Sequence, residues 1–283
     1  MKKYARYCIN AFNACLALCV AAIPFQTQAQ QRPLWELGIG TAAMHLPYYR
    51  GSESGRGYVL PYPYIIYRGE YLNVDEGEVR GLLYQSDDFV LDLSMAGGVP
   101  VPSDENGPRI GMPDLDPTLE FGPSAEFRLW HNKDRRGQHL WLHLPLRAAY
   151  SLDGRDTAHE GWIFAPYLEF SHASRDGSLE HSISFGPMFA DDAYHDYFYG
   201  VNPAFATPSR TAYEGRSGYN GSRLTLLTQK RVDSFFLSAF LRLDQLNGAV
   251  FTDSPLLQTR NYHIIGIAVS WILARSDETV YSR

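Results

Sequence analysis

The chain has 283 residues, with 25 Lys and Arg against 31 Asp and Glu, and a formal net charge of −6 at pH 7. This acidic balance argues against nucleic acid as a partner, because nucleic-acid phosphates are bound by clustered basic residues. The three cysteines (Cys8, Cys15 and Cys19) lie close to the N-terminus. The remainder of the chain therefore excludes disulfides, thiolate metal sites and a cysteine nucleophile.

The first 29 residues have the pattern of a secretory signal peptide. Lys2, Lys3 and Arg6 precede an apolar stretch, 14–23, and a small-residue exit that ends at Ala29. We expect cleavage there, which leaves residues 30–283 as a single domain. Removing the three basic residues of the leader leaves 22 basic against 31 acidic residues, a net charge of −9.

Two alternatives to a cleaved signal peptide are a membrane anchor and a lipoprotein signal. The apolar stretch is shorter than the roughly 20 residues that a membrane-spanning helix needs. A lipoprotein would use Cys19, but Leu18 is bulky where such signals have a small residue, and the apolar run continues beyond the cysteine.

Alternation of apolar and polar residues dominates the rest of the chain. In the segment 139–147, Leu140, Leu142, Leu144 and Leu146 oppose His139, Trp141, His143 and Arg147. Comparable patterns occur at 89–96, 118–130, 180–189 and 235–244. Period-two alternation over many segments predicts an all-β protein.

Three features favour a membrane barrel over a soluble sandwich. The segments approach the 9–11 residues of a tilted membrane-spanning strand. Their polar faces mix small groups with opposed charges, such as Glu126 with Arg128 and Arg242 with Asp244. Aromatic residues, which also form ordinary strands, gather near the segment ends as in interfacial girdles: Trp35, Tyr58, Tyr67, Tyr84, Trp130, Tyr150, Trp162 and Trp271.

The connections are expected to alternate between short and long, as they do in bacterial barrels. Short joints are predicted at Arg68, Gln85, His131, Ser174 and Arg231, and long loops from near Leu46, Gly97, Leu152, Ala190 and Gln245. If 70–84 is a hairpin turning at Glu76-Gly77, a closed antiparallel transmembrane β-barrel of twelve strands results, with both termini in the periplasm. One bent strand at 70–84, or a ten-stranded barrel, is the alternative.

The segment 263–271 is predicted to be the last strand of the barrel. Gly266, Ile267, Val269 and Trp271 have the spacing of the closing-strand signal that barrel assembly machinery reads. Ile267, Val269 and Trp271 are expected to face lipid. The chain continues past this strand, so that no aromatic residue ends it.

Three stretches resemble the MltA-interacting protein family, also called the MipA/OmpV family. The resemblance rests on the N-terminal stretch 38–69 and on the stretches 197–221 and 241–257, through Tyr48, Gly51, Ser52, Pro61, Tyr67, Tyr197, Tyr199, Gly200, Val201, Tyr213, Gly218, Gly248, Ala249, Asp253, Ser254 and Pro255. It implies an outer-membrane β-barrel. For some members it also implies scaffolding between a lytic transglycosylase and a murein synthase; other members are antigens, adhesins or envelope-stress proteins.

The function expected from this resemblance is an outer-membrane structural or scaffold protein and not an enzyme. Its expected partners are outer-membrane lipid and lipopolysaccharide, the barrel assembly machinery and periplasmic murein enzymes, and no cofactor or metal is expected. A narrow pore is the alternative. Interior charges could pair and close such a pore: Glu120, Glu126, Arg128, Arg147, Glu169 and Arg242.

A lipid hydrolase is the third hypothesis. His172 and Ser174 resemble the catalytic pair of outer-membrane lipid A deacylases, with Asp176, Glu169 or Glu180 to orient the histidine. Such pairs are common by chance, and the connection pattern places this one at the periplasmic end. His139 and His143 would lie roughly 13 Å apart on a strand, too far for one metal ion.

The long loops are expected to fold into the mouth of the barrel. Gly51, Gly200 and Gly218 would permit tight or left-handed backbone there. We expect an ordered plug formed mainly by residues 190–218, with the turn at Ser254-Pro255 packed beside it. The acidic and aromatic run 191–200 is interpreted as a solvated outer loop, with an oxygen-ligated divalent cation as the less favoured alternative.

Overall fold

The computed structural model describes residues 31–69, 72–75, 78–104, 107–132, 137–154 and 156–281. The predicted signal peptide and the predicted turn at Glu76-Gly77 lie outside these residues. The strands are β1 (Gln31–Pro33), β2 (Trp35–Pro47), β3 (Gly55–Arg68), β4 (Leu72–Asp75), β5 (Glu78–Gln85), β6 (Phe89–Gly98), β7 (Thr118–His131), β8 (Gln138–Asp153), β9 (Asp156–Phe164), β10 (Tyr167–Ala173), β11 (Leu179–Ala190), β12 (Gly218–Val232), β13 (Phe235–Gln245), β14 (Asn261–Arg275) and β15 (Thr279–Tyr281). The helices are η2 (Gly107–Arg109), α2 (Asp192–Tyr199) and η3 (Pro203–Phe205).

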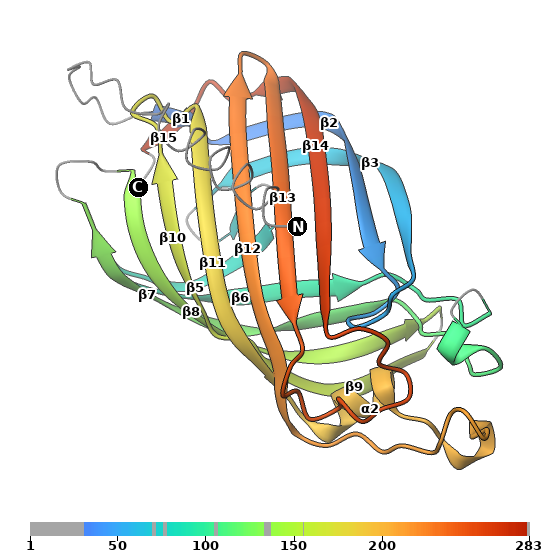
Figure 1. Cartoon of the computed structure of the whole chain (residues 1–283). Coiled ribbons are helices and arrows are strands. Elements are labelled where there is room, and N and C mark those ends of the chain that lie inside the picture. Colours follow the sequence, from blue (N-terminus) through green and yellow to red (C-terminus); the bar gives the residue numbers. More distant parts are fainter. Residues whose placement is uncertain are drawn as a thin grey trace, which may run out of the picture.

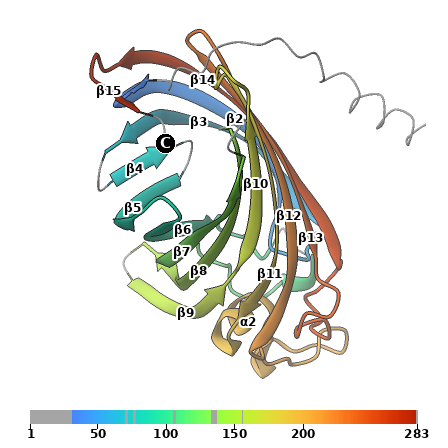
Figure 2. The same ribbon diagram turned by 90° about the vertical axis from the view of Figure 1, so that its left-hand side faces the viewer.

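Thirteen of the strands form one antiparallel sheet in which each strand has a neighbour on both sides. Sequential strands pair from β2 to β9 and from β10 to β14, and β14 pairs with β2. One half of β8 pairs with β9 and its other half with β10, and both of these strands also pair with β11. The sheet curves round an interior space (Figure 2).

β9 and β10 together form one strand position of the sheet, because the backbone pairing is interrupted between them. Pro166 lies in the break and has no N–H to donate to a neighbouring strand. The alternation of side chains predicted strands on both sides of this point but not the interruption.

The expected long loop after Leu152 is wrong. β8 and β9 form a hairpin whose last pair is Asp153 with Asp156. Gly154 in this turn has φ of +46°, a left-handed conformation that costs a glycine little. The short joints predicted at Arg68, Gln85, His131, Ser174 and Arg231 agree with the ends of β3, β5, β7, β10 and β12 to within a residue or so.

Apolar side chains cover the outer face of the sheet, while the interior face carries many polar and small side chains together with some apolar ones. On β14, Ile267 and Trp271 are 62% and 51% exposed, whereas Gly266 and Ser270, which precede them in the strand, are buried. On β7, Glu120 and Glu126 are buried and the intervening Phe121 is exposed. No helix in the described part of the chain is long and apolar enough to cross a membrane.

The two ends of the sheet differ in their connections (Figure 1). The loop end carries α2 and the connections that follow β2, β6, β11 and β13. The turn end carries the short turns and a small separate sheet in which Gln31–Pro33 of β1 pairs with Thr279–Tyr281 of β15. This second sheet, called the clasp below, joins the first and last described strands.

Candidate functional site

A central cavity of about 860 Å³ lies in the interior of the sheet. Residues from both halves of the chain line it, including Ala42, Tyr62, Arg147, Arg223, Phe240 and Arg242. Its volume falls within the range of roughly 300–1,000 Å³ that is typical of small-molecule sites. We call the layer between the cavity and the loop end the roof, and the layer toward the turn end the floor.

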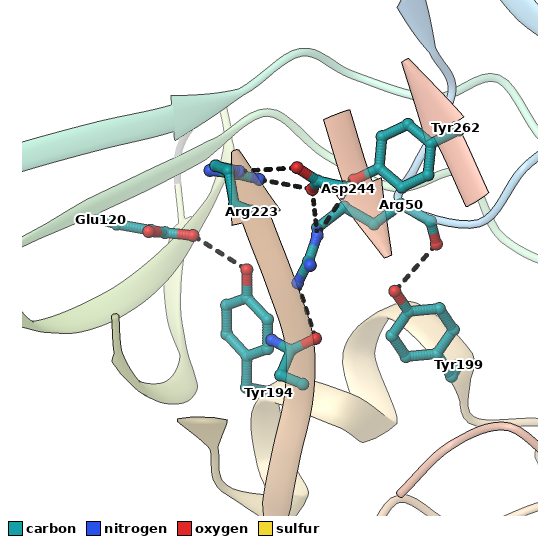
Figure 3. A network of polar contacts seen from close by, with 8 residues as sticks. Arg50, Glu120, Tyr194, Tyr199, Arg223, Asp244 and Tyr262 are labelled. Carbon is teal, nitrogen blue, oxygen red and sulfur yellow. Dashed lines mark hydrogen bonds and ion pairs between the residues drawn. The ribbon is translucent and has the colours of Figure 1, made fainter. Parts of the chain in front are cut away.

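The roof contains an ionic cluster centred on Asp244 of β13 (Figure 3). Arg223 of β12 donates hydrogen bonds of 2.9 Å to both carboxylate oxygens of Asp244, and Arg50 donates one of 3.0 Å. The Tyr262 hydroxyl also donates to this carboxylate. Arg50 further bonds the side-chain oxygen of Asn220 at 2.7 Å. A single buried carboxylate thus joins three strands to the loop after β2.

Helix α2 covers the cavity at the loop end. Asp191 caps the helix by accepting a hydrogen bond from the backbone N–H of Tyr194. The Tyr194 hydroxyl donates a 3.0 Å hydrogen bond to Glu120 on β7 (Figure 3). Glu120 in turn accepts a 3.1 Å bond from Arg147. Burial, and then the Glu120 charge, raise the pKa of Tyr194 well above its ordinary value, so this hydroxyl remains a donor.

An aromatic cluster joins the end of α2 to the loop after β13. The ring of Tyr199 stacks on Phe251 with centroids 3.7 Å apart, and its hydroxyl donates to the backbone oxygen of Arg50. Ser254 donates a 2.7 Å bond to the backbone oxygen of Tyr199. Burial raises the pKa of Tyr199. The buried members of this roof cluster are Tyr49, Val101, Leu115, Tyr199, Leu246, Ala249 and Phe251.

The floor is built on a second buried carboxylate, that of Glu36 on β2. Arg231 donates to both of its oxygens at 2.6 and 3.1 Å, and Arg68 donates at 3.0 Å. Tyr64 and Phe236 pack beside these ion pairs in an apolar cluster with Ile66. Glu36 and Ile66 are both 0% exposed, so the side chains pack closely around them.

One of the predicted histidines makes close contacts along the cavity wall. His143 lies 3.0 Å from Glu126 and stacks on Tyr167, with ring centroids 4.4 Å apart. No group of three or more His, Cys, Asp and Glu side chains in the described residues could hold a metal ion. The interior position predicted for His143 agrees with its burial.

The residues singled out from the sequence separate into three sets. Tyr199 and Ser254 bond directly, and Tyr48, Tyr197 and Tyr213 pack around the same roof cluster. Ser52 is buried beside it, Pro255 follows Ser254, and Val201 bridges to Tyr213. Pro61 lies apart from this cluster, on β3. Gly266, Ile267, Val269 and Trp271 lie together on β14.

Two of the three glycines expected to have tight or left-handed backbone are left-handed. Gly51 has φ of +89° and Gly218 has φ of +148°, whereas Gly200 has φ of −67°. A side chain at Gly200 is excluded for another reason, since its Cβ would lie 2.4 Å from the backbone oxygen of Asp196. Gly200 therefore fits the tight alternative of the prediction and not the left-handed one.

The run 191–200 is not a solvated loop. It forms α2, in which Tyr194, His195 and Tyr199 are buried. Within the segment 190–218, where the plug is predicted, the buried residues lie between positions 190 and 201. By contrast, most of the segment 202–209 is exposed.

Ser174 lies in the turn after β10 and not on the strand. Its hydroxyl donates a 2.6 Å bond to Asp176, and this bond is the main cause that lowers the pKa of Asp176. Asp176 also accepts from Ser178. The serine and the aspartate thus form a turn, in which the serine is a donor to a carboxylate.

The sequence analysis did not identify several residues of the site. Arg50, Asn220 and Tyr262 in the roof, and Glu36 with Arg231 in the floor, were not identified. An acidic residue at an interior position of a strand indicates that a cationic side chain lies nearby, because a buried carboxylate requires a cation. The sequence alone does not identify that cation, since Arg50 and Asp244 lie 194 positions apart.

Comparison with known proteins gives one family and several remote structures. The family described as MltA-interacting protein MipA matches residues 39–273. No curated protein matches the chain. A bacterial polysaccharide outer membrane secretin has 11% identity and a TM-score of 0.39, covering 86% of this chain and 99% of that one. The CymD monoaromatic hydrocarbon channel has 11% identity and a TM-score of 0.37, covering 86% and 89%. These distant similarities are not used to assign function.

Proposed function

Because the chain belongs to the MltA-interacting protein MipA family, we propose that it is an outer-membrane β-barrel that serves as an envelope scaffold. In this proposal the sheet forms a barrel that lies in the outer membrane. Its thirteen strands fill twelve places, since β9 and β10 share one. The connection pattern assigns the loop end to the cell exterior and the turn end to the periplasm, where bacterial barrels have short turns.

The outer face supports placement in a membrane. Large apolar side chains are exposed on most strands, among them Ile39, Val59, Met95, Phe121, Leu146, Phe185, Leu226, Leu237, Ile267 and Trp271. Soluble monomers rarely expose contiguous apolar patches of more than a few hundred Å². An alternating apolar face on antiparallel strands is what a barrel presents to lipid.

The observation that favours a scaffold over an axial pore is that buried ion pairs and packed side chains occupy part of the interior at both ends. Tyr194 on Glu120 and the Asp244 cluster form the roof. Glu36, Arg231 and the side chains of Tyr64, Ile66 and Phe236 form the floor. A solute that moved along the axis would have to displace both layers.

Conductance measurements test this choice. We expect the purified protein to show no porin-like conductance in planar bilayers. Replacing 202–209 by a short Gly-Ser linker should leave it closed, because this segment is mostly exposed and the buried roof residues lie in other segments. Open-porin conductance of the intact protein would overturn the scaffold proposal in favour of a pore.

The family description names MltA as an interacting protein, and we test it as a partner that binds the turn end. We expect immobilised MltA to retain the full-length protein from a detergent extract. Arg275 is exposed at the turn end and Arg260 is exposed at the loop end. Arg275→Glu should weaken retention and Arg260→Glu should not. Equal retention of both variants would place the contact elsewhere, and no retention of the unmodified protein would remove MltA as its partner.

We propose no enzymatic role for His172 and Ser174. The Ser174 hydroxyl is bonded to Asp176, which supports a structural role in the turn. Lipid A from cells that overexpress the protein should therefore have an unchanged mass spectrum. A spectrum that shifts with the native protein but not with Ser174→Ala would establish the hydrolase instead.

A further inference from the structure

Between β3 and β6, part of the sheet lacks paired strands. β3 pairs with β2 from Gly55 to Arg68, but with β4 only at Tyr67 and Arg68. β6 pairs with β7 from Phe89 to Gly98, but with β5 only from Val90 to Leu93. Among the described strands, the remaining edges therefore have no neighbour. We call this region, between 55–66 of β3 and 94–98 of β6, the side opening.

The intervening strands are short, with four residues in β4 and eight in β5, and they lie toward the turn end (Figure 2). The sequence of β3 agrees with a free edge. Pro61 and Pro63 lie two apart and lack N–H groups, so the same edge of the strand loses both donors. Prolines within sheets are confined mainly to such edges.

The central cavity reaches the side opening. Its lining includes Tyr62 and Ser94, which face the interior from β3 and β6. It also includes Pro63, Ile65 and Met95, which belong to the outward-facing positions of the same two strands. The side opening therefore connects the cavity with the outer face of the sheet.

The chemistry of the lining has two parts. Leu60, Leu227 and Phe240 are apolar side chains on the interior face, where a water-filled pore would present polar groups. Toward the roof, three arginines (Arg147, Arg223 and Arg242) line the cavity with one carboxylate, that of Glu169. The cavity thus combines an apolar wall with cationic groups at one end.

Arg242 is the arginine whose charge is least satisfied. Arg147 bonds Glu120, and Arg223 bonds Asp244. Both oxygens of Asp244 are already taken by Arg50, Arg223 and Tyr262. The buried Nε of Arg242 finds no hydrogen-bond partner among the described residues. A guanidinium in this position is suited to an anionic oxygen.

We propose that the central cavity binds a single-chain anionic amphiphile that enters from the membrane through the side opening. Its chain lies along Leu60, Leu227 and Phe240, and its carboxylate or phosphate contacts Arg242. The inference rests on the proposed function only in placing the side opening within a membrane. It is independent of MltA binding, which the retention experiment measures separately.

Photocrosslinking of the full-length protein in lipid nanodiscs tests this binding. Three photoreactive probes are compared: a fatty acid, a lysophosphatidic acid and an uncharged monoacylglycerol. We expect an anionic probe to label interior residues of β3, β12 or β13, as located by peptide mass spectrometry. Labelling by the fatty acid or by the lysophosphatidic acid identifies the source of the anion. Arg242→Gln should reduce this labelling about tenfold, the effect of losing a charge-assisted hydrogen bond.

Ala42 and Ala43 provide a matched pair of controls. Ala42 lines the cavity and Ala43 points to the opposite face of β2. Ala42→Trp should abolish interior labelling and Ala43→Trp should preserve it, with heat-dependent gel migration confirming that each variant is folded. If Ala42→Trp does not fold, competition by the unlabelled fatty acid replaces it. Labelling confined to outward residues, equal labelling by the uncharged probe, or labelling unaffected by Arg242→Gln would each overturn the proposal.

Discussion

Ser254 donates a hydrogen bond of 2.7 Å from its hydroxyl to the backbone oxygen of Tyr199, although the two residues lie 55 positions apart. Ser254 also accepts a bond from the backbone N–H of Leu256, so that one side chain shapes its own turn and holds the end of α2. Two loops that leave different strands therefore behave as one unit over the cavity.

Replacing Ser254 with alanine is expected to loosen this unit. The backbone oxygen of Tyr199 would lose its buried partner, at a cost of about 1–3 kcal/mol. Limited proteolysis of the membrane-embedded protein should show faster cleavage within 190–218. Ser209→Ala is the control, because Ser209 is exposed and bonds only weakly to Thr207 at 3.3 Å. Equal cleavage of the two variants would show that the bond does not hold the loops together.

Asp244→Asn should destabilise the protein more than any comparable change at the surface. The substitution keeps the shape of the side chain but leaves Arg50 and Arg223 without a carboxylate. Breaking a buried ion pair in this way costs about 3–5 kcal/mol. The temperature at which the folded gel band converts to the unfolded one should fall. Asp253→Asn, at an exposed loop position, should leave it unchanged. A normal conversion temperature for Asp244→Asn would mean that the cluster is not stabilising.

His195 makes the roof sensitive to acid. Burial, foremost, and the charge of Arg50 lower its pKa in the folded protein, while a hydrogen bond to the Arg216 backbone oxygen acts in the opposite direction. Because the unfolded imidazole, with a pKa near 6.5, binds the proton more tightly, protonation favours opening. The stabilising contribution is complete above about pH 6.5 and is lost as the pH falls toward the folded pKa.

We therefore expect amide hydrogen exchange in α2 to be faster at pH 5.5 than at pH 7.5 once the intrinsic rate has been corrected. His195→Gln should abolish this difference, since glutamine is neutral and can still donate to Arg216. His131, exposed at the turn end, provides the control variant His131→Gln, which should keep the pH effect. Its persistence in His195→Gln would assign the effect to another group.

Ile267→Arg tests which medium surrounds the sheet. Ile267 lies midway along β14 on the outer face, where an arginine near the centre of a bilayer costs about 2–4 kcal/mol. The folded fraction recovered in lipid vesicles should drop. Leu273→Arg, on the same strand near the turn end, should have a much smaller effect because the cost approaches zero at the interface. Equal folding of both variants would argue against a membrane around β14.

Local patterns in the sequence were sufficient to predict most of the strands. The alternation of side chains ends where β3, β5, β7, β10 and β12 end, since a short turn interrupts a period of two residues. The break at Pro166 was not anticipated, because apolar residues continue on either side of it. Helix α2 was missed as well, since eight residues are too few to show a helical period.

The site was less accessible to sequence reasoning than the sheet. Tyr199 and Ser254 were both identified, and their side-by-side packing was expected from the position of the loops. The ion clusters were not, because Arg50 meets Asp244 and Arg231 meets Glu36 only after distant strands have paired. The side opening follows from how few residues of β4 and β5 pair with their neighbours, a quantity that depends on strand length and register.

The clasp between β1 and β15 has a consequence for the order of assembly. Gln31–Pro33 can meet Thr279–Tyr281 at little entropic cost only after β14 has paired with β2, because that pairing has already closed the long intervening loop. Hydrogen bonds from Leu34 to Glu278 and from Ser276 to Trp35 extend the same junction. The clasp is thus a late event that cannot nucleate folding. Once formed, it slows reopening of the β2–β14 seam, since the seam cannot separate from this end until the clasp is broken.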